Sequence, residues 1–175
     1  MSARSYADES YRHSYLLAIA VIDFSQEAQV RKELRRLCLP GQYRLHMKNE
    51  RDSRRRALLA ELSRMPLSVH MVENRKPHRF RRITRDECLG EAVRILAELQ
   101  VGELILESCG QDPVDRRVLA RESMGQENSL KYSHTSPALE PLLWPSDLAA
   151  WAFGKGGHWR NQLGNLIGSV TRLGV

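Results

Sequence analysis

Apolar runs of strand length recur along the chain and alternate with segments of helical periodicity. Residues 15–23 form an apolar, partly β-branched run that is typical of a strand in a sheet core. The shorter segment 5–10 precedes it after a polar break, so the pair predicts a β-hairpin. Further strands are predicted at the alternating segment 42–48, at the apolar runs 67–72 and 104–107, and at the short, edge-like segment 130–134.

Helices are predicted between these strands by apolar residues that recur every three or four positions. Val30, Leu34 and Leu37 lie on one helical face after the N-cap candidate Ser25, and Thr84 with Glu87 has the pattern of a capping box. The early strands are antiparallel and the later ones alternate with helices, which predicts a mixed sheet with helices packed on it. The predicted helices cover about residues 25–37, 52–65, 84–100, 112–122, 146–153 and 159–170.

The composition is that of an ordinary globular protein. The chain has 175 residues, 42% hydrophobic and 27% charged, so we expect a single domain over residues 1–175. No apolar run reaches the roughly 20 residues that span a membrane, and the polar N-terminal segment lacks a signal-peptide pattern. We therefore expect a cytoplasmic protein without a membrane partner. The odd number and wide spacing of Cys38, Cys88 and Cys109 favour neither a disulfide framework nor a zinc site.

Positive charge is concentrated in two runs. The formal net charge is +6, and basic residues gather at 51–56 and 74–82. Such runs suit either a surface that contacts phosphates or, equally, a solvated helix face and a mobile loop. If the first interpretation holds, nucleic acid is the expected partner, while any protein partner is unknown. The candidate phosphate-binding residues are Arg54, Arg55, Arg79, Arg81 and Arg82.

Four acidic residues stand at the ends of predicted elements, where a sheet exposes its side chains. Asp8 ends the first strand, Glu107 ends a buried strand, Asp147 lies in the first turn of a helix, and Glu50 starts another. If the strand 67–72 lies beside the first strand with the Glu107 strand beyond, these ends can meet on one edge of the sheet. Adjacent strands there are about 4.8 Å apart. Asp147 also suits a helix cap, and Glu50 a pair with an arginine. Glu107 is harder to explain that way because it follows Leu-Ile-Leu.

Clustered carboxylates of this kind suit Mg²⁺ or Mn²⁺, which bind oxygen ligands together with waters and substrate phosphates. Two-metal sites hold ions about 3.5–4 Å apart and catalyse in-line displacement at phosphorus. Glu9 points to the opposite face from Asp8 unless the strand ends there. Glu9, His46 and His134 are therefore auxiliary candidates, and for the two histidines a structural or surface role is the alternative.

An ordered set of short motifs resembles a large, poorly characterised bacterial family, catalogued as a domain of unknown function and assigned a ribonuclease H-like fold. The family begins with an Asp-Glu-Ser motif, and the resemblance spans most of residues 5–158. The matching pieces are Tyr6-Ala-Asp-Glu-Ser10, Arg44-Leu-His-Met-Lys-Asn-Glu50, the strand that ends in Glu107, Ser133-His-Thr-Ser-Pro137, and the segment 141–152 around Asp147.

The resemblance implies a mixed five-stranded ribonuclease H-like sheet in the order 3-2-1-4-5, flanked by helices, with a C-terminal helical extension and a core of about 5–158. It carries Asp8 and Asp147 over as site residues, and less directly Glu50 and Glu107. In ribonuclease H itself an acid ends the fourth strand, and the fourth predicted strand of this chain ends near Glu73. Glu73 therefore competes with Glu107 for that position. The helix between the second and third strands departs from ribonuclease H.

These observations favour a Mg²⁺- or Mn²⁺-dependent nuclease, or a related phosphodiester-processing enzyme. Asp8, Glu107 and Asp147 would bind metal and Glu50 would assist them. Two alternatives stay open. The first is a catalytically inactive ribonuclease H-like module that binds nucleic acid. The second is a protein-interaction module whose basic residues are only exposed surface residues.

Overall fold

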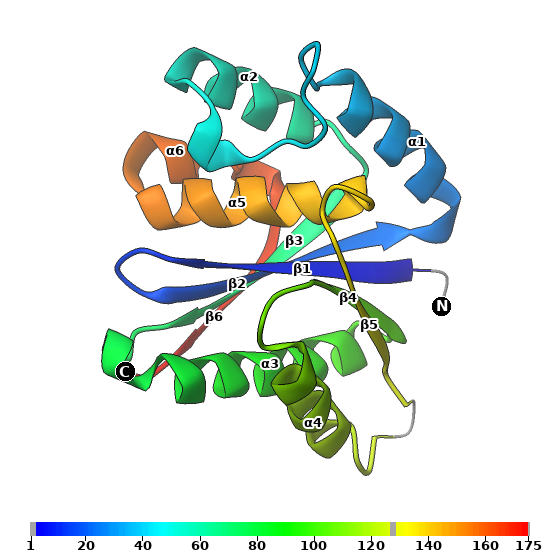
Figure 1. Cartoon of the computed structure of the whole chain (residues 1–175), viewed down its shortest axis with the longest axis vertical. Helices are drawn as coiled ribbons and strands as arrows, with labels where there is room; N and C mark the ends of the chain where they lie inside the picture. Colours follow the sequence, from blue (N-terminus) through cyan, green and yellow to red (C-terminus); the bar gives the residue numbers. More distant parts are fainter. Residues whose placement is uncertain (1–2, 127–128, 175) are drawn as a thin grey trace.

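The computed structural model describes residues 3–126 and 129–174, which form one six-stranded sheet between two layers of helices (Figure 1). The strand order is β5-β4-β1-β2-β3-β6. The order 3-2-1-4-5 implied by the resemblance is therefore present, with one further strand beyond β3. The strands are β1 Ala3–Tyr11, β2 Tyr15–Asp23, β3 Leu67–Asn74, β4 Glu103–Glu107, β5 Lys131–Thr135 and β6 Ile167–Leu173.

The predicted hairpin forms the middle of the sheet. β1 and β2 pair antiparallel from Ala3 opposite Asp23 to Tyr11 opposite Tyr15. β3 adds antiparallel to β2, whereas β4 pairs parallel to β1, β5 to β4 and β6 to β3. The segment 67–72 therefore does not lie beside the first strand, as expected, because β2 separates them. The strand that ends in Glu107 lies beside β1 instead.

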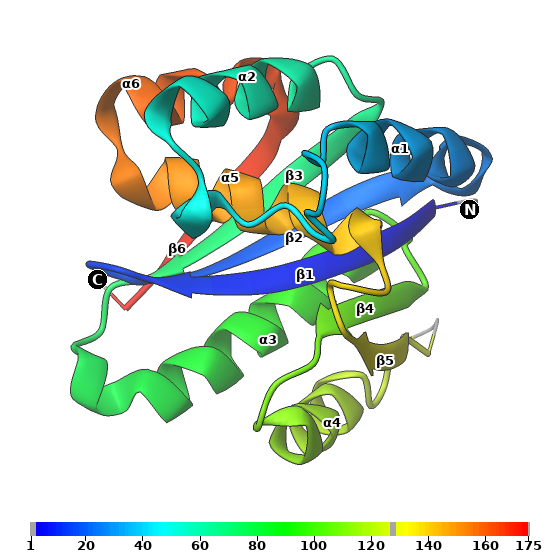
Figure 2. The ribbon, with the colours of Figure 1, turned by 45° about the horizontal axis from the view of Figure 1, so that its top comes forward.

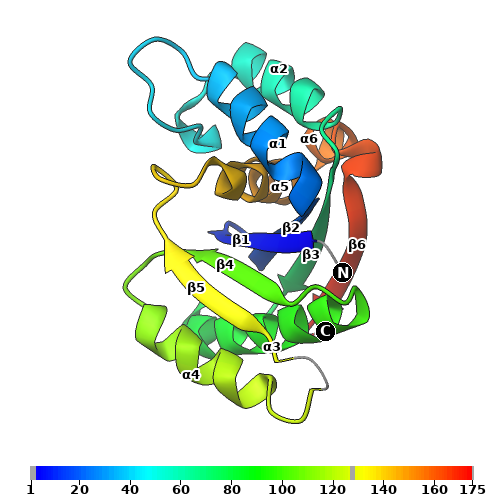
Figure 3. The ribbon, with the colours of Figure 1, turned by 90° about the vertical axis from the view of Figure 1, so that its right-hand side faces the viewer.

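Helices cover both faces of the sheet, as Figures 2 and 3 show from two further directions. On one face lie α1 Phe24–Arg36, α2 Asp52–Leu62, α5 Trp144–Lys155 and α6 Gly157–Asn161. The other face carries α3 Arg81–Glu98 and α4 Asp112–Glu122. Short 3₁₀ turns occur at Met47–Asn49, His78–Phe80, Pro141–Leu143 and Gly164–Leu166. No helix within the described ranges is long and apolar enough to cross a membrane.

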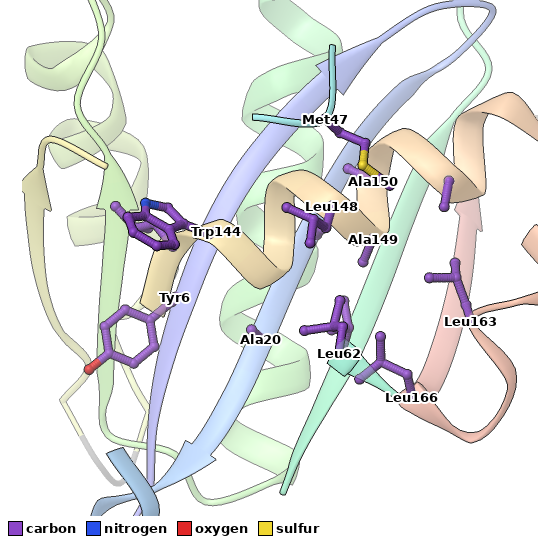
Figure 4. Close-up of a cluster of buried hydrophobic side chains, with 14 of the residues drawn as sticks. Tyr6, Ala20, Met47, Leu62, Trp144, Leu148, Ala149, Ala150, Leu163 and Leu166 are labelled. Atoms are coloured by element: carbon purple, nitrogen blue, oxygen red, sulfur yellow. The ribbon is translucent and has the colours of Figure 1, made fainter. Parts of the chain in front are cut away.

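Helix α5 packs directly on the centre of the sheet. The helix contacts both β1 and β2, and its small residues Ala149 and Ala150 are fully or almost fully buried (Figure 4). Ser146 Oγ donates to the carbonyl oxygen of Tyr6 at 2.7 Å and accepts from the Ala20 amide at 3.3 Å. The helix begins at Trp144, two residues before the start that the sequence predicted, and Ser146 lies within its first turn. These contacts fix the first turn of α5 over β1.

Two predicted elements are wrong. Residues 42–48 form a loop and the start of a 3₁₀ turn rather than a strand, although the buried Leu45 and Met47 explain their alternating pattern. The predicted helix 159–170 breaks after Asn161. The backbone turns at Gly164, where φ is +45°, and continues as strand β6. The C-terminal extension is thus helical only in part.

Candidate active site

Asp8 and Glu107 lie side by side on one face of the sheet. Ala7 pairs with Leu106 in the parallel β1–β4 ladder, so the next residues along the two strands are Asp8 and Glu107. Asp8 is 8% exposed and lies inside β1, which continues to Tyr11, rather than at its end. Glu107 is the last residue of β4, as predicted. The two acids come together because strands distant in sequence are adjacent in the sheet.

Asp147 reaches the same site from the first turn of α5. Its Oδ2 accepts a hydrogen bond of 2.9 Å from the Met47 amide, and its Oδ1 lies 3.0 Å from His46 Nδ1. The hydrogen bond to Asp147 raises the pKa of His46 above its ordinary value. Asp147 therefore has a fixed orientation, and the loop that carries His46 is attached to it.

The three carboxyl groups influence one another electrostatically. Burial, a hydrogen bond with Glu107 and the charges of Glu107 and Asp147 raise the pKa of Asp8 well above its ordinary value. The nearby Arg44 acts in the opposite direction, and its Nη1 lies 3.6 Å from Glu107 Oε1. Asp8, Glu107 and Asp147 line one pocket of about 240 Å³, together with His46 and Glu9. This pocket is called the acidic pocket below.

Glu9 contributes to the wall of the acidic pocket from the opposite face of β1. Its carboxylate accepts hydrogen bonds from the Tyr15 hydroxyl and from Arg85, and Arg81 lies 3.9 Å away. Arg85 in turn forms a bidentate ion pair with the fully buried Asp115. Its Nε donates to Oδ1 at 2.8 Å and its Nη2 donates to Oδ2 at 2.7 Å. Glu9 is therefore held by a buried cation rather than directed toward Asp8.

His134 lies outside the acidic pocket. Its Nε2 is 3.1 Å from Asp115 Oδ2, the oxygen that also accepts from Arg85. Cys109, Asp112 and Asp115 also come within 4.8 Å of one another, as metal ligands would. However, Arg85 already neutralises Asp115, and Asp112 accepts from Ser108 Oγ and the Cys109 amide. The guanidinium of Arg85 thus occupies the position of a cation at this second cluster.

The other two acidic candidates are elsewhere. Glu50 is buried, accepts a 2.6 Å hydrogen bond from Gln42 Nε2, and lies 3.7 Å from Arg54. Glu73 lies on β3 and accepts hydrogen bonds from Ser14 and Arg172. Strand β2 separates β3 from β1. Neither lines the acidic pocket. Between Glu73 and Glu107, the acid beside Asp8 is Glu107.

The basic candidates divide into two groups. Arg55 donates to the Met47 carbonyl at 3.0 Å and its guanidinium lies 4.4 Å from the Trp151 ring centre, so it stabilises α2 against α5. Arg54 faces Glu50, and Arg79 lies over Phe80. By contrast, Arg81 and Arg82 line a second pocket of about 620 Å³, called the basic pocket below. It shares Glu9, Arg85 and Cys109 with the acidic pocket.

Sequence reasoning did not select Arg44 or Arg85, which both contact acids of the site. Arg44 stands two residues before His46, within one of the segments that resemble the bacterial family, so the sequence contained a signal for it. Arg85 lies in a long helix among other arginines, and only its burial, 8% exposed, distinguishes it. No local pattern indicates that burial.

Comparison with known proteins identifies the fold. No family model and no curated protein matches the sequence. Ribonuclease HII of Archaeoglobus fulgidus, solved in complex with PCNA, superposes with a TM-score of 0.57 at 17% identity, over 89% of this chain and 73% of that one. Ribonuclease H2 of Pyrococcus horikoshii gives a TM-score of 0.59 at 15% identity, over 87% and 72%. The chain has a ribonuclease H-like fold.

A third structure with the ribonuclease H-like fold extends the comparison. A point mutant of Bst-RNase HIII superposes with a TM-score of 0.52 at 13% identity, over 94% of this chain and 53% of the other. The fold class implied by the sequence is thus confirmed. Membership of the bacterial Asp-Glu-Ser family stays a prediction, because no family model matches.

Proposed function

We propose that this protein is a nuclease, or a related phosphodiester-processing enzyme, that depends on Mg²⁺ or Mn²⁺. The observation that carries the proposal is the convergence of Asp8, Glu107 and Asp147 in one pocket, from β1, β4 and α5 of a ribonuclease H-like fold. Each carboxylate comes from a different element. An arrangement that only stabilised the fold would not require three acids to be gathered at one point.

The chemistry of the donors fits a hard divalent cation. The acidic pocket offers carboxylate oxygens, which Mg²⁺ and Mn²⁺ prefer. Burial and the neighbouring acids Glu107 and Asp147 raise the pKa of Asp8, and a cation between the carboxylates would relieve their repulsion. When bound there, a divalent cation supplies activation of water and neutralisation of charge on the phosphate. Asp8, Glu107 and Asp147 would hold it.

The neighbouring residues have supporting roles in this proposal. His46 and the Met47 amide hold Asp147 in orientation, at 3.0 Å and 2.9 Å. Arg44 and Arg81 place positive charge at the borders of the acidic pocket, where the phosphates of a substrate would lie. Glu50 is given no catalytic role in this proposal, because it lies outside the acidic pocket, hydrogen-bonded to Gln42 and 3.7 Å from Arg54.

The first test is thermal stability with and without Mg²⁺ and Mn²⁺, for the wild type and Asp8→Asn. A ligand that binds only the folded state raises the melting temperature according to its affinity. We expect a metal-dependent rise in the wild type that is lost in Asp8→Asn and kept in Glu61→Gln, an exposed acid on α2. A rise of equal size in Asp8→Asn would place the metal elsewhere.

The second test is hydrolysis of DNA and RNA probes in the presence of Mn²⁺. Asp8→Asn, Glu107→Gln and Asp147→Asn should each reduce the rate by several orders of magnitude, because each removes a charge that binds metal. Full metal-dependent activity in all three variants would refute the proposal.

A second candidate is a nucleic-acid-binding module without catalysis. The favouring observation is that Glu9 and Glu107 face arginines, Arg85 and Arg44, which could take the place of a metal. This candidate predicts no metal response and salt-sensitive binding that persists in Asp8→Asn.

A further inference from the structure

Beside the acidic pocket lies a third cavity, of about 380 Å³, lined by residues of the loop after α1. Its lining residues include Tyr43, Arg44, His46 and Asn49. His46 lines both this cavity and the acidic pocket, and the basic pocket joins the acidic pocket on its other boundary. The acidic pocket therefore shares lining residues with both of the other cavities.

Tyr43 has an unusual position for a large aromatic residue. It is 75% exposed, whereas Tyr6 and Tyr15 are buried. Exposure of an apolar ring to water is unfavourable, and burial of that ring against a ligand would be favourable. Isolated exposed aromatics need no explanation by themselves. Here, however, Tyr43 lines a cavity that shares His46 with the candidate catalytic pocket.

The loop presents Tyr43 from a fixed backbone. On one side of Tyr43, Gln42 forms two hydrogen bonds with Leu39: its amide donates to the Leu39 carbonyl at 2.9 Å, and its Oε1 accepts from the Leu39 amide at 3.0 Å. Its Nε2 also donates to the buried Glu50 at 2.6 Å. Glu50 thereby anchors the loop. On the other side, Arg44 contacts Glu107 and His46, at 3.6 Å and 3.5 Å.

The two neighbours of the acidic pocket differ in chemistry. The cavity at Tyr43 offers an aromatic face together with Gln42 and Asn49, which suits a nucleobase. The basic pocket offers Arg81 and Arg82, which suit phosphates. In Figure 3 the segment between α1 and α2 lies on the same side of the molecule as the carboxyl ends of β4 and β5. A strand across the acidic pocket could thus contact both neighbours.

We propose that the substrate is a single-stranded nucleic acid, and that Tyr43 stacks on an unpaired base next to the phosphate held in the acidic pocket. This inference rests on the proposed function and names its substrate class. An aromatic face can stack on any base, but only if that base is free of a duplex stack. Arg81 and Arg82 bind the backbone on the other side of the carboxylates.

The test is binding of a short fluorescein-labelled single-stranded oligonucleotide, measured by anisotropy at low salt with Ca²⁺ in place of Mg²⁺ or Mn²⁺, so that the carboxylates keep a divalent counter-ion. Tyr43→Ala should bind about 5- to 150-fold more weakly than the wild type, as expected for the loss of one stacked base. Tyr43→Phe, which keeps the ring, should bind like the wild type. Met124→Ala, an equally exposed apolar residue after α4, is the control and should have no effect.

A single abasic nucleotide, moved along the probe, identifies the contact. At one position it should weaken binding to the wild type and abolish the difference between wild type and Tyr43→Ala. The inference would be overturned if the abasic nucleotide weakened binding equally at every position, or if Tyr43→Ala bound as tightly as the wild type. It would also be overturned if the wild type preferred the matched duplex to the single strand. Absence of binding by the wild type would overturn it as well. The metal-dependent rise in melting temperature needs no oligonucleotide, so failure here is distinguishable from failure of the proposed function.

Discussion

Asp8 and Glu9 are adjacent in sequence but lie in different surroundings, because β1 directs successive side chains to opposite faces of the sheet. Asp8 is buried and faces Glu107 and Asp147, and its burial together with these two acids raises its pKa. Glu9 faces Arg85, whose guanidinium compensates its charge. One carboxylate, that of Asp8, thus lies among other acids that repel it, and the other, that of Glu9, lies beside an arginine that attracts it. Only the first has a reason to bind a cation.

The buried pair of Arg85 and Asp115 gives a prediction at the scale of single residues. Asp115 is fully buried and Arg85 is 8% exposed. Asp115→Asn leaves Glu9 as the remaining acid beside Arg85 and removes the charge of the buried partner that makes two hydrogen bonds to it, so it should lower the free energy of unfolding by about 3 kcal/mol. Urea denaturation measures this change.

The matched control for this prediction is Asp52→Asn. Asp52 pairs with Arg55 at 2.8 Å, but its side chain is 61% exposed, so its loss should cost less than about 1 kcal/mol. Equal effects of the two substitutions would mean that the burial of Asp115 does not decide its contribution.

The sequence made some of these residues predictable and not others. Asp8, Glu107 and Asp147 follow or interrupt apolar patterns, and an acid in such a place needs a partner. The group of Arg85, Asp115 and His134 joins α3, α4 and β5, and no local pattern relates those three residues. His134 therefore lies with a different group of acids from the one that the sequence suggested.

At the scale of elements, His70 joins β3 to β6. Its Nδ1 lies 2.8 Å from Ser169 Oγ and its Nε2 lies 3.2 Å from Ser68 Oγ. A Cβ atom at Gly168 would stand 2.7 Å from the ring, so only glycine leaves space for it. Burial lowers the pKa of His70 below its ordinary value of 6.5.

This lowered pKa predicts a loss of stability in acid. Well above its ordinary pKa of 6.5, His70 is neutral in both the folded and unfolded states and has no effect on the pH dependence. As the pH falls below that value, the unfolded chain binds a proton more readily, so stability decreases by at most about 1.4 kcal/mol per pH unit.

The measurement is urea denaturation of the wild type and His70→Gln at several pH values between about 5 and 7.5. The stability of His70→Gln should fall less steeply with acid than that of the wild type. The exposed His13, replaced by glutamine, should leave the slope unchanged. If stability fell equally steeply with acid in the wild type and in His70→Gln, protonation of His70 would not be the cause of the loss.

The wrong elements have physical explanations as well. Residues 42–48 alternate because Leu45 and Met47 insert into the core from a loop, which gives the same pattern as a strand. Residues 159–170 contain Leu163 and Leu166 at helical spacing, but Gly164 and Gly168 interrupt them. Strand β6 forms there because it pairs with the free edge of β3. Such a tertiary partner is not visible in a local pattern.

At the scale of the whole molecule, the sheet order determines which charges meet. β4 lies beside β1, so Glu107 reaches Asp8, and α5 crosses the same face with Asp147. The start of α3 brings Arg81 and Arg82 to the neighbouring basic pocket. The order 3-2-1-4-5 was predictable only through the resemblance, because periodicity identifies strands but not their neighbours.

The net charge of +6 is therefore less informative than its distribution. If nucleic acid binds across the acidic and basic pockets, its affinity should fall with salt, with a slope set by the number of phosphates contacted. The double substitution of Arg81 and Arg82 by glutamine removes about two such contacts. The slope of log affinity against log salt should then decrease by roughly 1.4 for a single strand.

The matched control for this double substitution replaces Arg35 and Arg36 by glutamine. These exposed residues lie at the end of α1, on the opposite face of the sheet from α3, and the change in net charge is identical. Fluorescence anisotropy over a salt series distinguishes the two variants. An equal decrease in both would show that net charge alone governs binding, whereas a decrease confined to Arg81 and Arg82 would locate the path of the strand beside the carboxylates.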